Sequence, residues 1–296
     1  MSRVRLHRTE AIVLKRHDFG EADRILTLLT PDRGKLSAIA KGVRRIASRK
    51  SGHVELFTRT AVLLAEGRNL HVLTQAETID PYCPIRDDLV RATYAYHVAE
   101  LVDRFVGEGV ESRPAYEQLR LGLESIASAP DPSLATRYFE VRFLDVLGYR
   151  PQLFHCAACG REMMAGDAAF SPEAGGVLCR DCAGGHVDRL ALADSAFRAM
   201  RFIQTRDWAM VRRIDLTPAT RAVLESVMHA YVRHLLERDL KSVELLRGLR
   251  KVGGASAGTS STRSPTGSPA AHSNAPSSAP SSARADRSPG GRREPS

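Results

Sequence analysis

Two Cys-x-x-Cys steps constrain this chain more than any other feature of its sequence. The first step is Cys156 with Cys159, the second is Cys179 with Cys182, and nineteen residues separate them. Each step turns two thiolates toward one ion, and a segment of this length lets the second step complete a four-sulfur shell. The sequence therefore predicts a tetrahedral Zn²⁺ site with Cys156, Cys159, Cys179 and Cys182 as ligands.

We expect this ion to be structural, one per chain, because four sulfur ligands leave no coordination position for water or substrate. Gly160 suits the tight turn after the first pair. Two disulfides or a dithiol redox motif are the alternatives. No signal peptide opens the chain, so we expect a reducing cytoplasmic location. His155 and His186 flank the pairs as substitute ligands or polar neighbours, and Cys83 is expected to be a small buried residue.

Charge indicates the class of partner. The formal net charge is +9 and the sequence pI is near 9.6, so polyanions are expected, nucleic acid before an anionic membrane surface. No stretch approaches the ~20 apolar residues that span a bilayer. Membrane binding is therefore not expected.

The first part of the chain has the pattern of short strands. The turn sequence at residues 31–34, P-D-R-G, predicts a hairpin. Five strands within about 80 residues favour a Greek-key barrel of the oligonucleotide-binding (OB) type over a sandwich, which needs about seven. The predicted strands are residues 11–15, 24–29, 35–40, 54–64 and 70–79.

Helical periodicity replaces the strand pattern after residue 81. The predicted helices are residues 89–106, 116–127, 134–147, 194–205 and 218–237, the last with Thr217 as N-cap and Pro218 at its first position. The fold class is thus α+β, with an OB-type barrel (1–80) and a helical domain (81–252) that contains the zinc-binding segment (154–186). Residues 253–296, rich in Ser, Pro, Ala and Arg, are predicted to be disordered.

A basic segment lies where such a barrel connects its third and fourth strands. Residues 35–54 contain six Lys or Arg residues and no Asp or Glu, and a run of this kind either binds phosphates or is a solvated face. Few aromatic residues accompany it, so binding should be mainly electrostatic, salt-sensitive and tolerant of both strand forms. The candidate phosphate-binding residues of this segment are Lys35, Lys41, Arg44, Arg45, Arg49 and Lys50.

The sequence lacks the motifs of phosphate-binding loops, dinucleotide sites, zinc proteases and serine hydrolases. We therefore expect no enzymatic activity. Two other hypotheses stay open: a zinc-containing hydrolase or nuclease, which the all-cysteine site disfavours, and an RNA-binding zinc-ribbon adaptor.

Several long motifs resemble one family. TEAIVLKRxDFGEADRILTLLT at residues 9–30 and GKLxxxAKGVRR at 34–45 resemble the start of the bacterial RecO recombination mediator proteins. FEVRFLDVLGYRPQLxxCxxCG at 139–160 and LKSVELL at 240–246 resemble the approach to the zinc segment and the closing motif of that family. The resemblance covers roughly residues 5–250.

This resemblance implies an OB barrel, a helical bundle and a zinc-binding insertion that some relatives have lost. Members bind single- and double-stranded DNA and anneal complementary strands. With the partner RecR they help load RecA onto DNA coated by single-strand-binding protein (SSB), in the RecF pathway, so the expected location is cytoplasmic and associated with the nucleoid. The SSB C-terminal tail docks on the helical part in some relatives. By position, the DNA-binding face would include Lys41, Arg44 and Arg45, with Arg24, Lys35, Arg49 and Lys50 around them.

Overall fold

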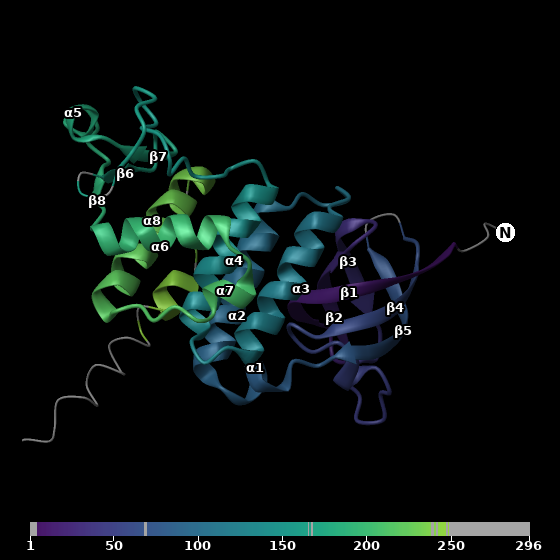
Figure 1. Cartoon of the computed structure of the whole chain (residues 1–296). Helices are drawn as coiled ribbons and strands as arrows, with labels where there is room; N and C mark the ends of the chain where they lie inside the picture. Colours follow the sequence, from purple (N-terminus) through teal and green to yellow (C-terminus); the bar gives the residue numbers. More distant parts are fainter. Residues whose placement is uncertain are drawn as a thin grey trace, which may run out of the picture.

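The computed structural model describes residues 5–67, 70–164, 166, 168–237, 240, 242–246 and 248. The predicted disordered tail lies outside the described residues. Figure 1 shows a barrel at one end of the molecule, a helical bundle in the middle and a small insertion at the far end.

The barrel is closed and has five strands, which confirms the predicted OB-type fold. The strands follow one another around the barrel in the order β1-β2-β3-β5-β4, and only β3 and β5 pair in parallel. Their bounds are β1 Leu6–Phe19, β2 Asp23–Thr30, β3 Gly34–Ala40, β4 Arg59–Ala65 and β5 His71–Asp80.

Three predicted strand boundaries were wrong. β1 runs from Leu6 to Phe19 rather than over residues 11–15, because residues 6–10 pair with β4 and residues 15–19 pair with β2. Neither end of this strand carries the apolar alternation by which a sequence reveals a strand. β4 begins at Arg59 rather than at Val54. The buried residues Val54 and Phe57 lie in the segment that connects β3 to β4 and not in a strand, and Phe57 adopts a left-handed φ of 66°.

Gly34, at the end of the predicted hairpin turn, packs closely against the backbone of the segment that precedes α3 (Arg113–Ser128). Its φ is +62°, and a Cβ placed there would lie 1.8 Å from the Val110 carbonyl oxygen. Next to it, the Gly109 N–H donates to the Lys35 carbonyl at 2.8 Å. Only glycine permits both the left-handed turn and this close backbone approach.

The predicted helices are all present. α3 begins three residues before the predicted start, at Arg113, because its first two residues, Arg113 and Pro114, are exposed and add nothing to the apolar periodicity. Thr217 caps α8 through its side chain, as predicted. The bounds are α1 Cys83–Asp87, α2 Leu89–Phe105, α3 Arg113–Ser128, α4 Pro132–Val146, α6 Asp194–Thr205, α7 Trp208–Val211 and α8 Pro218–Leu236.

The insertion contains a small sheet and one short helix. The sheet order is β7-β6-β8, and strands of two or three residues are too short to leave a periodic sequence signal. The elements are β6 Ala169–Ser171, β7 Gly176–Leu178, α5 Arg180–Ala183 and β8 Leu190–Ala191. Cys83, expected to be buried, is exposed, because α1 turns only Ile85 toward the core.

One hydrophobic core runs from the outside of the barrel into the helical bundle. Ile12, Leu14 and Leu29 of the barrel belong to the same buried cluster as the helix residues, while a second cluster fills the barrel interior. Burial of this continuous apolar surface holds the two parts together.

A buried polar network lies among the helices. The Glu140 Oε1 atom lies 2.6 Å from His97 Nε2 and 2.9 Å from an Arg137 nitrogen. All three side chains are at most 4% exposed. The other imidazole nitrogen of His97 lies 3.0 Å from the Ser242 hydroxyl. The network therefore joins α2, α4 and the helical residues 242–246.

Candidate nucleic-acid interface and metal centre

The basic loop, residues 41–50, connects β3 to the short helix η1 (Ser51–His53). It is fixed to the barrel near its start: Val43 is fully buried in the barrel interior, and the Gly42 N–H donates to Asp23 Oδ1 at 2.7 Å. Gly42 has a φ of +67°, which begins the turn. The loop thus has one apolar anchor, while the side chains after it point outward.

Two of the predicted DNA-binding residues hold this loop in place. Arg44 lies 3.4 Å from an Asp18 oxygen and donates to the Gly20 carbonyl, in the turn between β1 and β2. The Lys50 ammonium donates to the carbonyls of Lys41 and Leu73 at 3.1 and 3.2 Å. These contacts tie one end of the loop to the β1–β2 turn and the other end to β5.

The remaining loop cations are exposed. The side chains of Lys41, Arg45 and Arg49 have no hydrogen-bond or ion-pair partner among the residues that the structure describes. Ile46, in the middle of the loop, is also fully exposed. Unpaired guanidinium and ammonium groups on a projecting loop can bind phosphate oxygens without first breaking an internal ion pair.

Arg24 does not join these free cations. Its guanidinium lies 2.8 Å from Asp18 and 3.3 Å from Glu55, and its side chain is 18% exposed. The hydrogen bond from Arg24 holds the pKa of Asp18 below its ordinary value. Arg24 therefore serves mainly as the ion-pair partner of Asp18 and Glu55. No local sequence pattern identified these ion pairs.

Lys35 lies apart from the loop, at the junction of the barrel and the helices. Its ammonium contacts the carbonyl and the carboxylate of Asp103 in α2, and its side chain is 12% exposed. Lys15 bonds the same carboxylate. The structure thus brings together Lys41, Arg44, Arg45, Arg49 and Lys50, and separates Lys35 from them.

The four predicted metal ligands form one cluster in the insertion. Their sulfur atoms all lie within 4.8 Å of one another, and no disulfide joins them. The first pair lies in a turn closed by the Gly160 N–H, which donates to the Cys156 carbonyl at 2.9 Å. The second pair lies at the start of α5, where Cys179 is the N-cap. Two short local structures thus bring four thiols to one point.

This geometry fits a zinc ion. Sulfur ligands about 2.3 Å from Zn²⁺ lie about 3.8 Å apart at the corners of a tetrahedron, and the Cys159 and Cys179 sulfurs are 3.8 Å apart. The four cysteines could therefore bind a metal such as zinc. His155 and His186 are not members of this cluster.

Electrostatics favour a cation at the cluster when its thiols are ionised. Burial raises the pKa of Cys156. Hydrogen bonds from the N–H groups of Cys179, Cys159 and Ala158 lower it by more than burial raises it, so that the pKa falls to about 6. Hydrogen bonds to the Cys179 and Cys159 sulfurs raise the pKa of Cys182 to about 12. Thiolates this close cannot all be charged without a positive ion to offset their repulsion.

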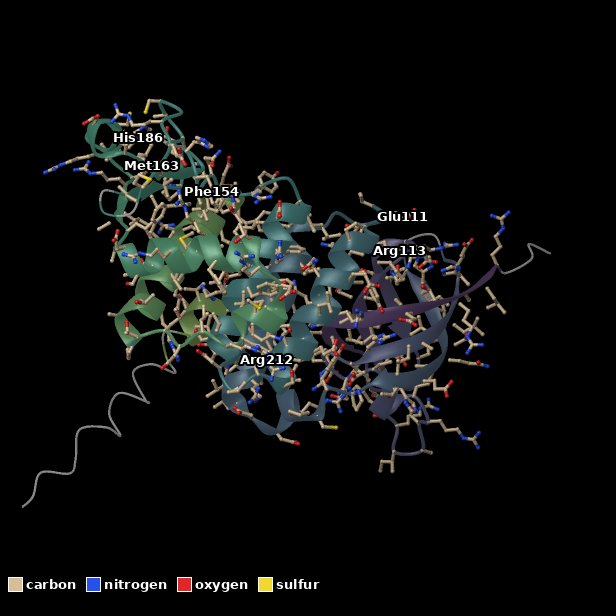
Figure 2. All side chains as sticks on the ribbon, viewed as in Figure 1. Glu111, Arg113, Phe154, Met163, His186 and Arg212 are labelled. Carbon is tan, nitrogen blue, oxygen red and sulfur yellow. The ribbon has the colours of Figure 1, made fainter. Side chains whose placement is uncertain are left out.

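Arg201 attaches the insertion to α6. Its guanidinium lies 4.6 Å from the centre of the Phe154 ring and donates to the Leu153 and Met163 carbonyls at 2.8 and 2.7 Å. Figure 2 labels Phe154, Met163 and His186 within this end of the molecule. The cysteine cluster and the basic loop lie at opposite ends of the structure (Figure 1).

Two protein families match this chain, and together they span nearly all of its described residues. The family "Recombination protein O N terminal" matches residues 1–82, and "Recombination protein O C terminal" matches residues 86–244. Every helix in the described part of the chain is too short or too polar to cross a lipid bilayer.

Individual relatives align over most of their length. A DNA repair protein RecO of Roseiflexus sp. (strain RS-1) is 46% identical over 252 residues, which are 84% of this chain and 88% of that protein. A DNA repair protein RecO of Dehalococcoides mccartyi (strain ATCC BAA-2266 / KCTC 15142 / 195) is 36% identical over 82% of this chain and 96% of its own. One of Moorella thermoacetica is 36% identical over 80% and 89%.

Proposed function

The chain belongs to the Recombination protein O family of DNA repair proteins, and on that premise we propose that it binds single- and double-stranded DNA and anneals complementary strands. The observation that carries this proposal is the basic loop, which projects from the barrel with Lys41, Arg45 and Arg49 exposed and unpaired among the described residues. Phosphate oxygens of single- or double-stranded DNA would form ion pairs with these side chains.

The mechanism is physical. Two strands repel each other through their phosphates, and a cationic surface that binds both lowers this repulsion while it holds them close. Base pairing then supplies the driving force for annealing. No covalent bond forms or breaks, so the proposed activity needs no catalytic residue. If the cysteine cluster holds zinc, the ion keeps the insertion folded and leaves no position for substrate.

The proposed partners follow from the family. With RecR, the chain would help load RecA onto DNA coated by SSB, as part of the RecF pathway, and the SSB C-terminal tail would dock on the helical part. Complementary strands coated by SSB are thus the substrate we expect the chain to act on.

Annealing of two complementary oligonucleotides, one coated with SSB, tests the proposal across a salt series. We expect acceleration that falls steeply as salt rises. The variant Lys41→Ala/Arg44→Ala/Arg45→Ala should lose most of it. The control Arg206→Ala/Arg212→Ala/Arg213→Ala removes the same charge from exposed positions in the helical part, and should anneal like the unchanged protein.

Unchanged annealing by the loop variant would reject the loop as the DNA-binding surface. Absence of annealing by the unchanged, folded protein would reject the proposed function, and a clear preference for structured RNA would favour the RNA-binding alternative.

A further inference from the structure

The outer face of β4 and β5 carries a groove that includes Arg49 and Lys50 and extends beyond the predicted DNA-binding residues. It has a volume of about 750 Å³ and lies between these strands, β1 and the end of the basic loop. Figure 1 places β4 and β5 on the side of the barrel away from the helices. The groove is lined by Arg8, Ser48, Arg49, Lys50, Ala61, Val62, Leu63, Thr74, Gln75, Ala76 and Glu77.

Strand register determines the floor of the groove. Leu63 of β4 pairs with Arg8 of β1 on one side and with Gln75 of β5 on the other, so these three residues form a row across the sheet. Ala61 occupies the next outward position on β4. Ala61 and Leu63 are half-buried, whereas Val62 between them points into the barrel. The floor is therefore apolar, although it faces outward.

The walls of the groove are cationic and polar. The side chains of Arg8 and Arg49 are exposed and have no hydrogen-bond or ion-pair partner in the part of the chain that the structure describes. Lys50 adds a third positive charge, and Glu77 is the one carboxylate in the lining. Thr74 and Gln75 place a hydroxyl and an amide beside the floor. The lining thus combines positive charge, hydrogen-bonding groups and apolar surface.

We propose that this groove binds a segment of single-stranded DNA, with phosphates on Arg8 and Arg49 and base faces on Leu63 and Ala61. The proposal rests on the proposed function and assigns a strand form to one part of its binding surface. In a duplex both faces of each base are covered by neighbouring pairs, so the apolar floor has nothing to contact. An unpaired strand offers both the base face and the phosphates. The groove therefore selects single strands, whereas the exposed cations of the loop bind either form.

The groove and the basic loop share Arg49 and Lys50, so a strand in the groove lies next to phosphates bound by Lys41 and Arg45. This arrangement places a single strand beside a second strand of either form, which is the geometry that annealing needs.

A gain-of-function variant gives the sharpest test, since misfolding does not raise affinity. Leu63→Tyr puts an aromatic ring on the floor, at an outward strand position where aromatic residues are favoured. Stacking on one base should tighten binding of a fluorescently labelled oligothymidine at least about fivefold, with a duplex of equal length unchanged.

The loss-of-function variant is Arg8→Ala. Removal of one phosphate contact should lower the slope of log affinity against log salt by about 0.7 for the single strand and leave the duplex slope as it was. Arg212→Ala, an exposed arginine on the helical part (Figure 2), is the charge-matched control and should change neither slope.

Equal effects of Arg8→Ala on both strand forms, or no effect of either groove variant, would overturn the groove as a single-strand site. If the triple alanine variant of the loop still loses annealing in that case, the proposed function stands without the groove. If neither loop nor groove variants change DNA binding, both fail.

Discussion

Replacing Glu140 by glutamine tests how the helical bundle tolerates a buried charge. The change keeps the size of the side chain but removes the carboxylate that faces Arg137 at 2.9 Å and His97 at 2.6 Å. Both partners and Glu140 itself are almost fully buried. The Nε, NH1 and NH2 atoms of Arg137 have no hydrogen-bond partner among the described residues, so the substitution would remove the carboxylate that forms an ion pair with this buried charge.

The expected loss is large relative to the total stability. Breaking a buried ion pair from one side costs ~3–5 kcal/mol, against a typical ~5–15 kcal/mol for the free energy of unfolding. For a folded region of this size, each kcal/mol lowers the melting temperature by about 2–4 °C. Glu140→Gln should therefore lower it by roughly 6–20 °C.

Thermal and urea unfolding followed by circular dichroism measure this loss. Arg137→Met/Glu140→Gln should regain most of it, because no unpaired charge remains in the bundle. The control Glu124→Gln removes a carboxylate that faces Arg120 at 3.2 Å on the exposed side of α3, and should cost less than ~1 kcal/mol. A loss below ~1 kcal/mol for Glu140→Gln would refute the reasoning. It would show that water in the neighbouring cavity of about 160 Å³ solvates Arg137.

Two further predictions concern the metal and acid. Elemental analysis should find one zinc per chain, and Cys156→Ser/Cys179→Ser should lose it and expose residues 154–186 to hydrogen exchange, while duplex binding by the distant loop persists. Burial raises the pKa of Asp103, but Lys15 and Lys35 lower it below the ordinary 3.8. Its stabilising contribution is therefore present above pH ~4 and is lost as the pH falls through the lowered pKa. Urea unfolding across this range should show the loss, and Asp103→Asn should remove it.

The barrel could be predicted because its strands alternate and its hairpin turn has a distinctive sequence. The end of β1 could not, because residues 15–19 are exposed on the hairpin and show no apolar period. The start of β4 was predicted too early for the opposite reason. Val54 and Phe57 are apolar and buried, as strand residues often are, yet they lie in a connecting segment.

The clustering of the four cysteines was predictable because each pair is local and the spacing is short. The role of Lys35 was not, because its partner Asp103 lies 68 residues away in the sequence. Arg8 was missed for the same reason, since only the pairing of β1 with β4 brings it near the end of the basic loop. Charge runs identify cations, but the fold decides which of them are free.

The two tethers of the basic loop determine what binding would cost. Arg44 and Lys50 already fix its ends, and Val43 fixes its backbone near the start. A ligand that reaches Lys41, Arg45 and Arg49 then has to order side chains rather than ten residues of backbone, and ordering a long side chain costs only about 0.5–1.5 kcal/mol. Much of the conformational entropy is thus lost when the protein folds, before any DNA arrives, so affinity can be tuned by single exposed cations.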